Sequence, residues 1–453
     1  MRKLLKGVTL TTLATMLASS IGCGGNNIMS PEMIAGFNTT KPIFGLTSDP
    51  HQLAYYAAKK SQKKVDKKWS IFVYLGADNN LYTAGLDDIN EMEAGLSSEM
   101  AKNVNVIVLF DGEEEGDSVL YKIIPDKDGK NQTIISEKID DKGEIIPSSG
   151  EVDSGNKETF KKFLMWGVAN YPAQNYMVDV WDHGSGLFLK SQVPFHKVFV
   201  SDDQSGNHMQ TKDLNYVLPD VVKLAGKKID VLGFDACLMG HVELAYQVKD
   251  YVNYYVASEE TEPGDGWDYM GWFKRFSQNT RINGATLASH LVDSYVASYS
   301  PGGSQSNGYA QKVTLAATNL NALTGILVPA INQFGNALNS SLPDLKSTLS
   351  TIRASSETYY NSDCTDIYHF AELVTKNTSI PENIKVSAKS VMDGINKSVI
   401  REGHVGFKNS HGLVMYFPYK SWHTFNPKYT NPSEVLFAET KSWGNFLQNF
   451  LKK

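Results

Sequence analysis

The strongest constraint on the fold of this chain is a series of short apolar runs, each of which ends at a polar or glycine-containing loop. The runs lie at residues 71–75, 104–110, 177–181, 229–234 and 254–258. Segments with the three-to-four-residue apolar spacing of an amphipathic helix separate several of them. Strands that are apolar on both faces and alternate with helices are typical of a parallel sheet covered on both sides. The sequence therefore predicts an α/β fold with a mostly parallel sheet and helices on both faces.

The remaining sequence predicts a hairpin and a mainly helical C-terminal region. Residues 111–157 are charged and glycine-rich, with short alternating stretches that favour a hairpin excursion. Helical patterns dominate further on, with strand candidates at 313–317 and 412–417. We expect a main domain over residues 67–320 and a C-terminal region over 321–453 that contributes a strand to it.

Composition excludes several classes of protein. Hydrophobic residues make up 42% of the 453 residues and charged residues 20%, values typical of a globular protein rather than a disordered or polytopic membrane chain. The formal net charge is -6, without the basic patch that a nucleic-acid partner requires. We therefore expect no nucleic-acid partner.

The N-terminus has the pattern of an export signal. Basic residues precede an apolar run at 8–18, and small residues then lead to Gly22 and Cys23. The run is short for a membrane-spanning helix, so a cleaved signal peptide over residues 1–22 is the better interpretation. The protein is therefore expected to leave the cytoplasm.

Small residues before a cysteine resemble the lipobox of bacterial lipoproteins, in which that cysteine is acylated. We expect a lipid on Cys23 to anchor the protein to a membrane, in the periplasm or at the cell surface. Ser20 stands where leucine is usual, and the alternative is ordinary cleavage nearby that yields a secreted protein. Residues 23–66 are polar and end in a lysine-rich stretch, which predicts a tether or pro-segment.

Two of the apolar runs lead directly into reactive residues. One is followed by His183 and Gly184, and another by Ala236 and Cys237. The carboxyl ends of parallel strands lie at one edge of a sheet, where ligands bind, so we expect the two side chains to meet. Cys237 also precedes residues with helical spacing, and a helix N-terminus would lower the pKa of its thiol.

Such a pair is suited to acyl transfer. His183 would act as general base and then protonate the leaving amine, while Cys237 attacks. The backbone N–H groups of Gly184 and Cys237 would stabilise the oxyanion. A lone cysteine is usually an inert buried thiol and a lone histidine is usually only hydrogen-bonded, but here the histidine precedes the cysteine by 54 residues (237 − 183), close to the spacing of caspases.

Two neighbouring candidates receive no role. Asp182 is adjacent to His183 on a strand, where successive side chains point to opposite faces, so it is not assigned to a triad. Cys364 could pair with Cys237, but a lone distant disulfide is a weak framework, and we interpret Cys364 as a buried thiol.

The motifs around these residues resemble the clostripain family of cysteine peptidases. They are Asp182-His183-Gly184 and Asp235-Ala236-Cys237-Leu238-Met239, with supporting similarity at 78–81, 263–267 and 412–418. The resemblance implies a caspase-like fold, a catalytic domain over 67–320, a His183/Cys237 dyad, and cleavage of proteins or peptides after Arg or Lys.

A cationic substrate side chain in a pocket needs a carboxylate partner. Asp235, two residues before Cys237, is the first choice for this substrate-binding role, and Asp265, in a glycine-rich loop, is the second. Alternatively, Asp235 caps a helix beginning at Cys237 and Asp265 is an ordinary turn residue.

No metal ligands are assigned. The ten histidines show neither His-x-x-x-His nor His-Glu-x-x-His spacing, and the dyad requires no cofactor. Calcium assists some clostripain-like enzymes, but the sequence contains no calcium loop.

The resemblance also implies that the chain is made as an inactive precursor and is cut between its His and Cys blocks. Lys197 is the preferred self-cleavage site, because Pro194 favours an extended backbone before it. Lys190 is the alternative, and both lysines could instead be ordinary solvated loop residues.

Two rival functions remain. One is a caspase-like or legumain-like peptidase of another specificity, which the acids near Cys237 argue against. The other is a surface lipoprotein that uses the domain only for binding, which predicts the loss of Cys237 or His183.

Overall fold

The computed structural model describes residues 49–131, 133–187, 199–306, 311–420 and 425–452. All of these described residues belong to one compact unit. The signal peptide predicted over 1–22, the predicted lipidation site Cys23 and the two candidate self-cleavage lysines, Lys190 and Lys197, all lie outside the described residues. Among the residues described, no helix is both long enough and apolar enough to cross a bilayer.

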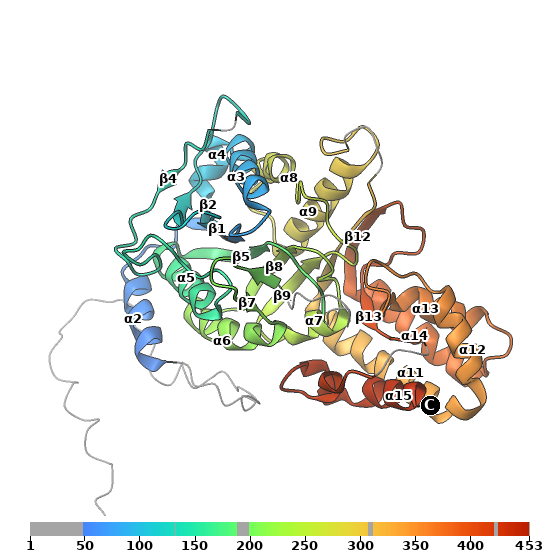
Figure 1. Cartoon of the computed structure of the whole chain (residues 1–453). Coiled ribbons are helices and arrows are strands. Elements are labelled where there is room, and N and C mark those ends of the chain that lie inside the picture. The colour runs from blue at the N-terminus through green and yellow to red at the C-terminus, as the bar shows by residue number, and fades with distance from the viewer. Residues whose placement is uncertain (1–48, 132, 188–198, 307–310, 421–424, 453) are drawn as a thin grey trace, which may run out of the picture. The chain divides into compact units, whose positions relative to one another are not determined.

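A mixed sheet forms the centre of this unit, as the sequence predicts (Figure 1). Within the described residues it has nine strands in the order β12-β10-β9-β8-β5-β1-β2-β3-β4. The five strands from β9 to β2 are parallel, and antiparallel strands flank them on both sides. The strands are β1 (Lys67–Gly76), β2 (Val104–Asp111), β3 (Val119–Lys122), β4 (Glu137–Lys138), β5 (Ala173–Trp181), β8 (Ile229–Asp235), β9 (Val252–Ala257), β10 (Val313–Asn319) and β12 (Val399–Val405).

Helices cover both faces of the sheet (Figure 1). On β1, Ile71 and Val73 point into a core shared with α3, α8 and α9. The alternate residues Phe72 and Tyr74 contact rings of α5. The helices of the sheet region are α2 (Pro50–Ser61), α3 (Tyr82–Gly95), α4 (Ser98–Asn103), α5 (Lys157–Asn170), α6 (Leu214–Ala225), α7 (Val242–Gln247), α8 (Tyr269–Ser277) and α9 (Gly284–Tyr299). Because successive strand side chains point to opposite faces, a strand that is apolar throughout requires both layers.

The C-terminal part is mainly helical and packs around aromatic side chains. The ring of Phe417 lies 5.1 Å from that of Phe370 and 5.5 Å from that of Trp443, measured between centroids. Its helices are α10 (Leu320–Ala322), α11 (Val328–Ser340), α12 (Leu342–Ser355), α13 (Ile367–Lys376), α14 (Glu382–Ser398) and α15 (Ser442–Leu451). The domain boundary predicted at 320–321 falls directly after β10.

The strand candidate at 412–417 does not join the main sheet. Within it, β13 (Val414–Tyr416) pairs with β11 (Cys364–Asp366) in a separate small sheet. The strand that pairs with β10 is β12, which the sequence analysis missed because it contains Arg401, Glu402 and His404 and is only half-buried. A partly exposed edge strand does not need the continuous apolar run that marks a central one.

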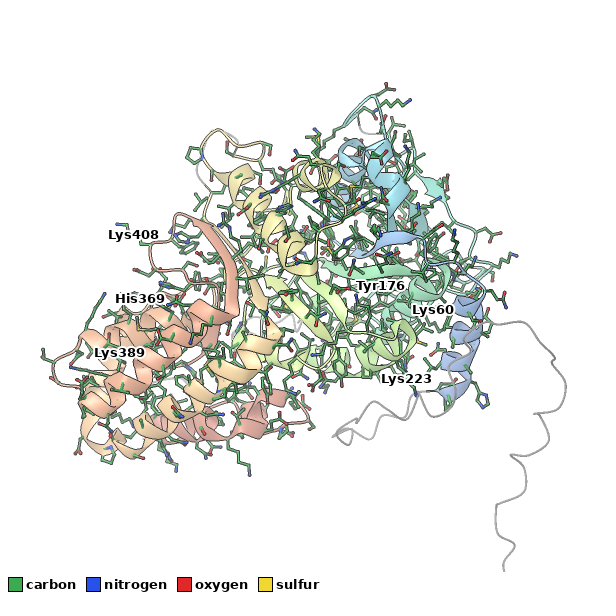
Figure 2. All side chains as sticks on the ribbon, turned by 180° about the vertical axis from the view of Figure 1, so that it is seen from behind. Lys60, Tyr176, Lys223, His369, Lys389 and Lys408 are labelled. Carbon is green, nitrogen blue, oxygen red and sulfur yellow. The ribbon has the colours of Figure 1, made fainter. Side chains whose placement is uncertain are left out.

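The second half of the predicted tether is a helix that packs on the main unit. Asp49 caps α2 by accepting a hydrogen bond from the backbone N–H of His51. The Lys60 ammonium of α2 donates to the carbonyls of Leu224 and Ala225 at the end of α6, at 2.7 and 2.8 Å (Figure 2). A cation placed there satisfies carbonyls that the helix itself cannot pair. Residues 50–61 are therefore part of the folded unit and not a free tether.

Candidate functional site

The register of β5 and β8 brings the His183 loop against the Cys237 turn. Trp181 pairs with Asp235, and His183 and Cys237 each follow two residues later. Gly184 lies so close to the Cys237 turn that an added Cβ would be 2.2 Å from the Cys237 carbonyl oxygen. Only a residue without a side chain fits this approach. The meeting of the two loops at one edge therefore follows from parallel pairing.

Cys237 lies on a strained turn and not at a helix N-terminus. The helix after it, α7, begins only at Val242, and Leu238 between them adopts a left-handed φ of 64°. The Cys237 sulfur accepts a hydrogen bond from the Glu262 backbone N–H at 3.3 Å. Burial nevertheless raises the pKa of the Cys237 thiol, with a further contribution from the negative charge of Asp235. The predicted lowering of its pKa is therefore wrong, and a base is needed to form the thiolate.

His183 is oriented by an asparagine that the sequence analysis did not single out. Its Nε2 lies 2.9 Å from the Asn80 side-chain oxygen. With that amide oxygen as acceptor, Nε2 carries the proton and Nδ1 is the basic nitrogen. The pattern Asn79-Asn80 after β1 was visible in the sequence, but a polar turn alone did not distinguish this contact from an ordinary loop.

Asp182 holds the loops around His183 in place. Its buried carboxylate accepts hydrogen bonds from the Asn79 side chain at 2.9 Å and from the Ser201 backbone N–H at 2.5 Å. These contacts tie the loop after β1 and the segment around residue 201 to the end of β5. Asp182 therefore supports the arrangement of loops next to His183.

Asp235 lies beneath Cys237 as a buried acid. Its Oδ2 accepts from the backbone N–H of Trp267 at 3.1 Å and lies 3.0 Å from the Tyr269 hydroxyl. Burial raises the pKa of Asp235 to about 6. Because its bonds run to the loop after β9, Asp235 does not cap a helix starting at Cys237.

Glu262 is a second acid at this place, and the sequence analysis missed it. Both of its carboxyl oxygens are buried, and its carboxyl group shares a side-chain hydrogen bond with that of Asp235. Burial and the neighbouring Asp235 charge raise the pKa of Glu262 well above its usual range. The only signal in the sequence was its place two residues before Gly264, in the loop that also holds Asp265. We call Asp235 and Glu262 the thiol-side acids.

The other residues predicted near the pocket lie in different environments. Asp265 is exposed, while its carbonyl accepts a hydrogen bond from the Gln305 side chain at 2.7 Å. Trp181 and Trp267 are buried in the core. Cys364 is a buried free thiol, and Cys237 is also free, so the two form no disulfide.

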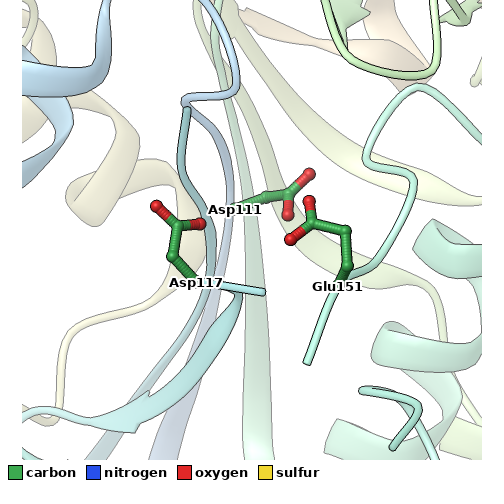
Figure 3. A group of neighbouring side chains, drawn as sticks. All are labelled: Asp111, Asp117 and Glu151. Carbon is green, nitrogen blue, oxygen red and sulfur yellow. The ribbon is translucent and has the colours of Figure 1, made fainter. Parts of the chain in front are cut away.

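One further group of acids lies elsewhere at the same edge of the sheet. Asp111, Asp117 and Glu151 each offer one oxygen, and these oxygens lie within 4.8 Å of one another (Figure 3). We call them the β2-end acids. Asp111 and Asp117 lie close together in sequence, but Glu151 comes from a distant segment, so local sequence did not indicate that the three acids meet.

Comparison with known proteins identifies the class of this fold. It resembles a secreted C11 cysteine protease from Bacteroides thetaiotaomicron, with a TM-score of 0.60 and 18% identity over 83% of this chain and 99% of that one. It also resembles an inactive zymogen C11 protease from Parabacteroides distasonis, with a TM-score of 0.54 and 16% identity over 79% and 94% of the two chains. At these identities the likeness concerns the fold.

Sequence comparison then gives the family. Residues 73–450 match the Clostripain family, and the chain therefore belongs to the clostripain family of cysteine peptidases. It is 30% identical over 284 residues to clostripain of Hathewaya histolytica, across 56% of this chain. The match covers 52% of that relative, so the two share about half of the relative's length.

Proposed function

We propose that this chain is an exported cysteine endopeptidase that cuts peptide bonds after Arg or Lys, with His183 and Cys237 as its dyad. The observation that carries the proposal is the pair of thiol-side acids, whose carboxyl groups are buried beside a cysteine that faces a histidine loop and form no ion pair with a lysine or arginine of the described residues. Membership of the clostripain family supports the chemistry.

In the proposed reaction, Nδ1 of His183 takes the thiol proton as the Cys237 sulfur attacks the peptide carbonyl carbon. The backbone N–H groups of Gly184 and Cys237 would hold the resulting oxyanion. His183 then gives its proton to the leaving amine, and a thioester remains. Water, deprotonated by His183, attacks the thioester, and the acid product leaves as Cys237 regains its proton.

The thiol-side acids favour a cationic side chain before the scissile bond. Two carboxyl groups in contact cannot both ionise at low cost when they are buried. A guanidinium or ammonium group placed beside them would compensate the charge of the ionised forms, whereas Asn or Asp would not. Asp265, at the exposed side of the same loop, remains the second candidate for this role.

A panel of reporter peptides tests the proposal directly. The protein is incubated with otherwise identical peptides that end in Arg, Lys, Asn or Asp before the reporter, with and without a thiol alkylator. We expect cleavage after Arg and Lys that the alkylator abolishes. Cleavage after Asn or Asp instead would support a legumain-like or caspase-like specificity. Binding without any cleavage would support the non-catalytic surface protein.

Self-processing is part of the proposal. A related C11 protease is known as an inactive zymogen, and in this chain Lys197, or alternatively Lys190, stands between the His and Cys blocks. Mass spectrometry of the wild type beside Cys237→Ala provides the test. Two fragments that meet after one of these lysines in the wild type alone would support self-cleavage, whereas a fully active intact chain would contradict it.

Export with a lipid anchor at Cys23 completes the proposal. The Bacteroides relative is described as secreted, and the basic and apolar pattern before Cys23 supports export here. Replacing Cys23 with Ser should move the protein from the membrane fraction to the soluble fraction. A variant that stays with the membranes would exclude the anchor.

A further inference from the structure

The amino ends of the parallel strands lie at the edge of the sheet opposite His183 and Cys237. Because β1, β5, β8 and β9 run in the same direction, their first residues share this edge. Three segments that lead into these strands, 62–68, 223–230 and 249–251, are rich in lysine. We call their eight lysines the amino-edge lysines: Lys63, Lys64, Lys67, Lys68, Lys223, Lys227, Lys228 and Lys249.

Hydrogen bonds connect these lysines from one strand to the next. The Lys68 ammonium donates to the Gln174 side-chain oxygen in β5 at 3.1 Å, and the Lys227 ammonium donates to the Gln174 carbonyl at 2.9 Å. The Lys228 ammonium donates to the Lys249 carbonyl, before β9, at 2.8 Å. Lysines that are far apart in the chain are therefore neighbours along one edge of the sheet.

Acids compensate only part of this positive charge. Two of the lysines form ion pairs with acids of the same segments, Lys227 with Asp230 and Lys249 with Asp250. The other six form no ion pair within the part of the chain that the structure describes, and the exposed Asp66 is the third acid of the segments. Eight lysines and three acids give these segments a formal charge of +5 (8 − 3), in a chain whose net charge is -6.

The net charge of the chain conceals this surface. The sequence analysis found no basic patch, because the lysines come from separate segments and acids elsewhere outnumber them. Folding gathers the lysines at the amino ends of the strands, whereas Asp111 and Asp235 are the last residues of β2 and β8. The thiol-side acids and the β2-end acids thus lie at the opposite edge, and the folded chain has one basic and one acidic edge.

An exposed apolar side chain stands among the lysines. Val65 is 49% exposed, and it lies between the pair Lys63-Lys64 and the pair Lys67-Lys68. Basic side chains combined with an apolar one are typical of surfaces that bind an anionic bilayer, because the ammonium groups attract lipid phosphates and the apolar group enters the acyl boundary. A nucleic acid would use the charges alone. The combination therefore favours a membrane as the partner.

We propose that the amino-edge lysines and Val65 bind the surface of a membrane that contains anionic phospholipids. Such a surface attracts the basic edge of the sheet and repels the acidic one. The edge at which His183 and Cys237 meet would then face away from the bilayer, where a protein substrate can reach it. The inference goes beyond the proposed peptidase activity and does not require acylation of Cys23, since the lysines contact the lipid headgroups themselves.

Amine labelling of the full chain tests which face meets the membrane. The protein is treated with a lysine-acylating reagent beside vesicles of phosphatidylcholine, with or without phosphatidylglycerol, and mass spectrometry follows the labelling of each lysine. We expect the exposed Lys63, Lys64 and Lys223 to react several-fold more slowly on the anionic vesicles than on the neutral ones. Lys389 and Lys408, which are exposed and lie well away from Lys223 (Figure 2), should react equally on both.

Paired substitutions measure how much the surface contributes to binding. Lys63→Gln combined with Lys64→Gln should weaken binding to the anionic vesicles about 25-fold, because each lysine near such a surface contributes about fivefold. Both side chains are exposed, so the melting temperature should not change. Lys389→Gln combined with Lys408→Gln is the matched control, since it removes the same charge and should bind as the wild type does.

Three outcomes would overturn the proposal. One is equal labelling of the amino-edge lysines on neutral and anionic vesicles. Another is an equal loss of affinity in both paired variants, because diffuse charge would then explain the binding. The third is protection of the same lysines by short duplex DNA but not by vesicles, which would assign the surface to nucleic acid. None of these results depends on cleavage of a reporter peptide, so this proposal and the peptidase proposal can fail separately.

Discussion

The thiol-side acids and the β2-end acids lie at the carboxyl edge of the same sheet, at the ends of different parallel strands. The carboxyl groups of the thiol-side acids are buried, whereas among the β2-end acids Asp111 is buried and Asp117 and Glu151 are half-buried. Neither group forms an ion pair with a lysine or arginine among the described residues. The thiol-side acids are two carboxyl groups that lie next to a cysteine. The β2-end acids are three, with one oxygen of each within 4.8 Å of the others.

This difference shows which group is suited to bind a substrate side chain. Two acids beside a nucleophile can hold the end of a long substrate side chain and leave its peptide bond at the sulfur. The β2-end acids are instead held by nearby donors, since Asp117 accepts from the Gly112 backbone N–H and Asp111 accepts from the Ser118 hydroxyl. The number and spacing of the carboxylates therefore distinguish the two places better than their total charge.

The largest expected effect comes from removing the nucleophile, and it tests whether the thiol-side acids lie beside a catalytic cysteine. Cys237→Ala should lower kcat/KM for basic peptides by about 1000-fold or more, because the covalent step is lost. His183→Ala should be nearly as damaging. Activity within a few-fold of wild type in either variant would contradict the assignment of His183 and Cys237 as the catalytic dyad.

Asp235→Asn should lower kcat/KM for Arg and Lys peptides by about 100-fold, because a buried cation loses its charged partner. Asp111→Asn is the matched change in the other group, and it should not alter the preference for basic residues. Kinetics with both variants check the separation. An unchanged preference for basic residues in folded Asp235→Asn would move the specificity role to Asp265.

Glu262→Gln should have a smaller effect, about tenfold on kcat/KM for basic peptides, because Asp235 still supplies one charge. The backbone N–H that contacts Cys237 is retained in this variant. Asp265→Asn, an exposed acid of the same loop, is the control and should change kcat/KM less. The reverse order would show that the loop surface, and not the buried pair, selects the substrate.

The smallest expected effect is on pH dependence. The pKa of Asp235 is raised to about 6, so the acid is ionised above this pH and protonated below it. Binding of a cation needs the ionised form, so kcat/KM for basic peptides should fall about twofold from this group alone at pH 6, and further below it. The residual activity of Asp235→Asn should lack this step. If kcat/KM of that variant falls by the same factor over the same pH range, a group other than Asp235 is titrating.

The sequence predicted the parts of the fold that depend on local apolar content. The central strands are apolar on both faces, and parallel pairing then placed His183 and Cys237 at one edge without any further information. The edge strand β12 is only half-buried and contains polar residues, so it lacks the continuous apolar run that marks the central strands. The prediction of a helix starting at Cys237 was wrong. Residues with helical spacing, such as Val242, indicate that a helix is present but do not show at which residue it begins.

The environment of the candidate site was less predictable than its residues. Glu262 is buried against Asp235, and neither its burial nor this contact is visible in local sequence. The contact between Asn80 and His183, and the approach of Glu151 to Asp111 and Asp117, join residues that are far apart in the chain. Spacing rules detect sites built from one segment, but they do not detect sites that only the folded chain assembles.

The pairing of β5 with β8 has a consequence for a chain cut between its two reactive residues. Such a cut would leave β1 to β5 on one fragment and β8 to β12 on the other, while the β5–β8 pairing lies in the interior of the sheet. The fragments would remain together as a non-covalent heterodimer, held by the backbone hydrogen bonds and buried side chains of a shared sheet. Maturation would thus change the covalent connectivity of the protein and preserve the surface on which His183 and Cys237 meet.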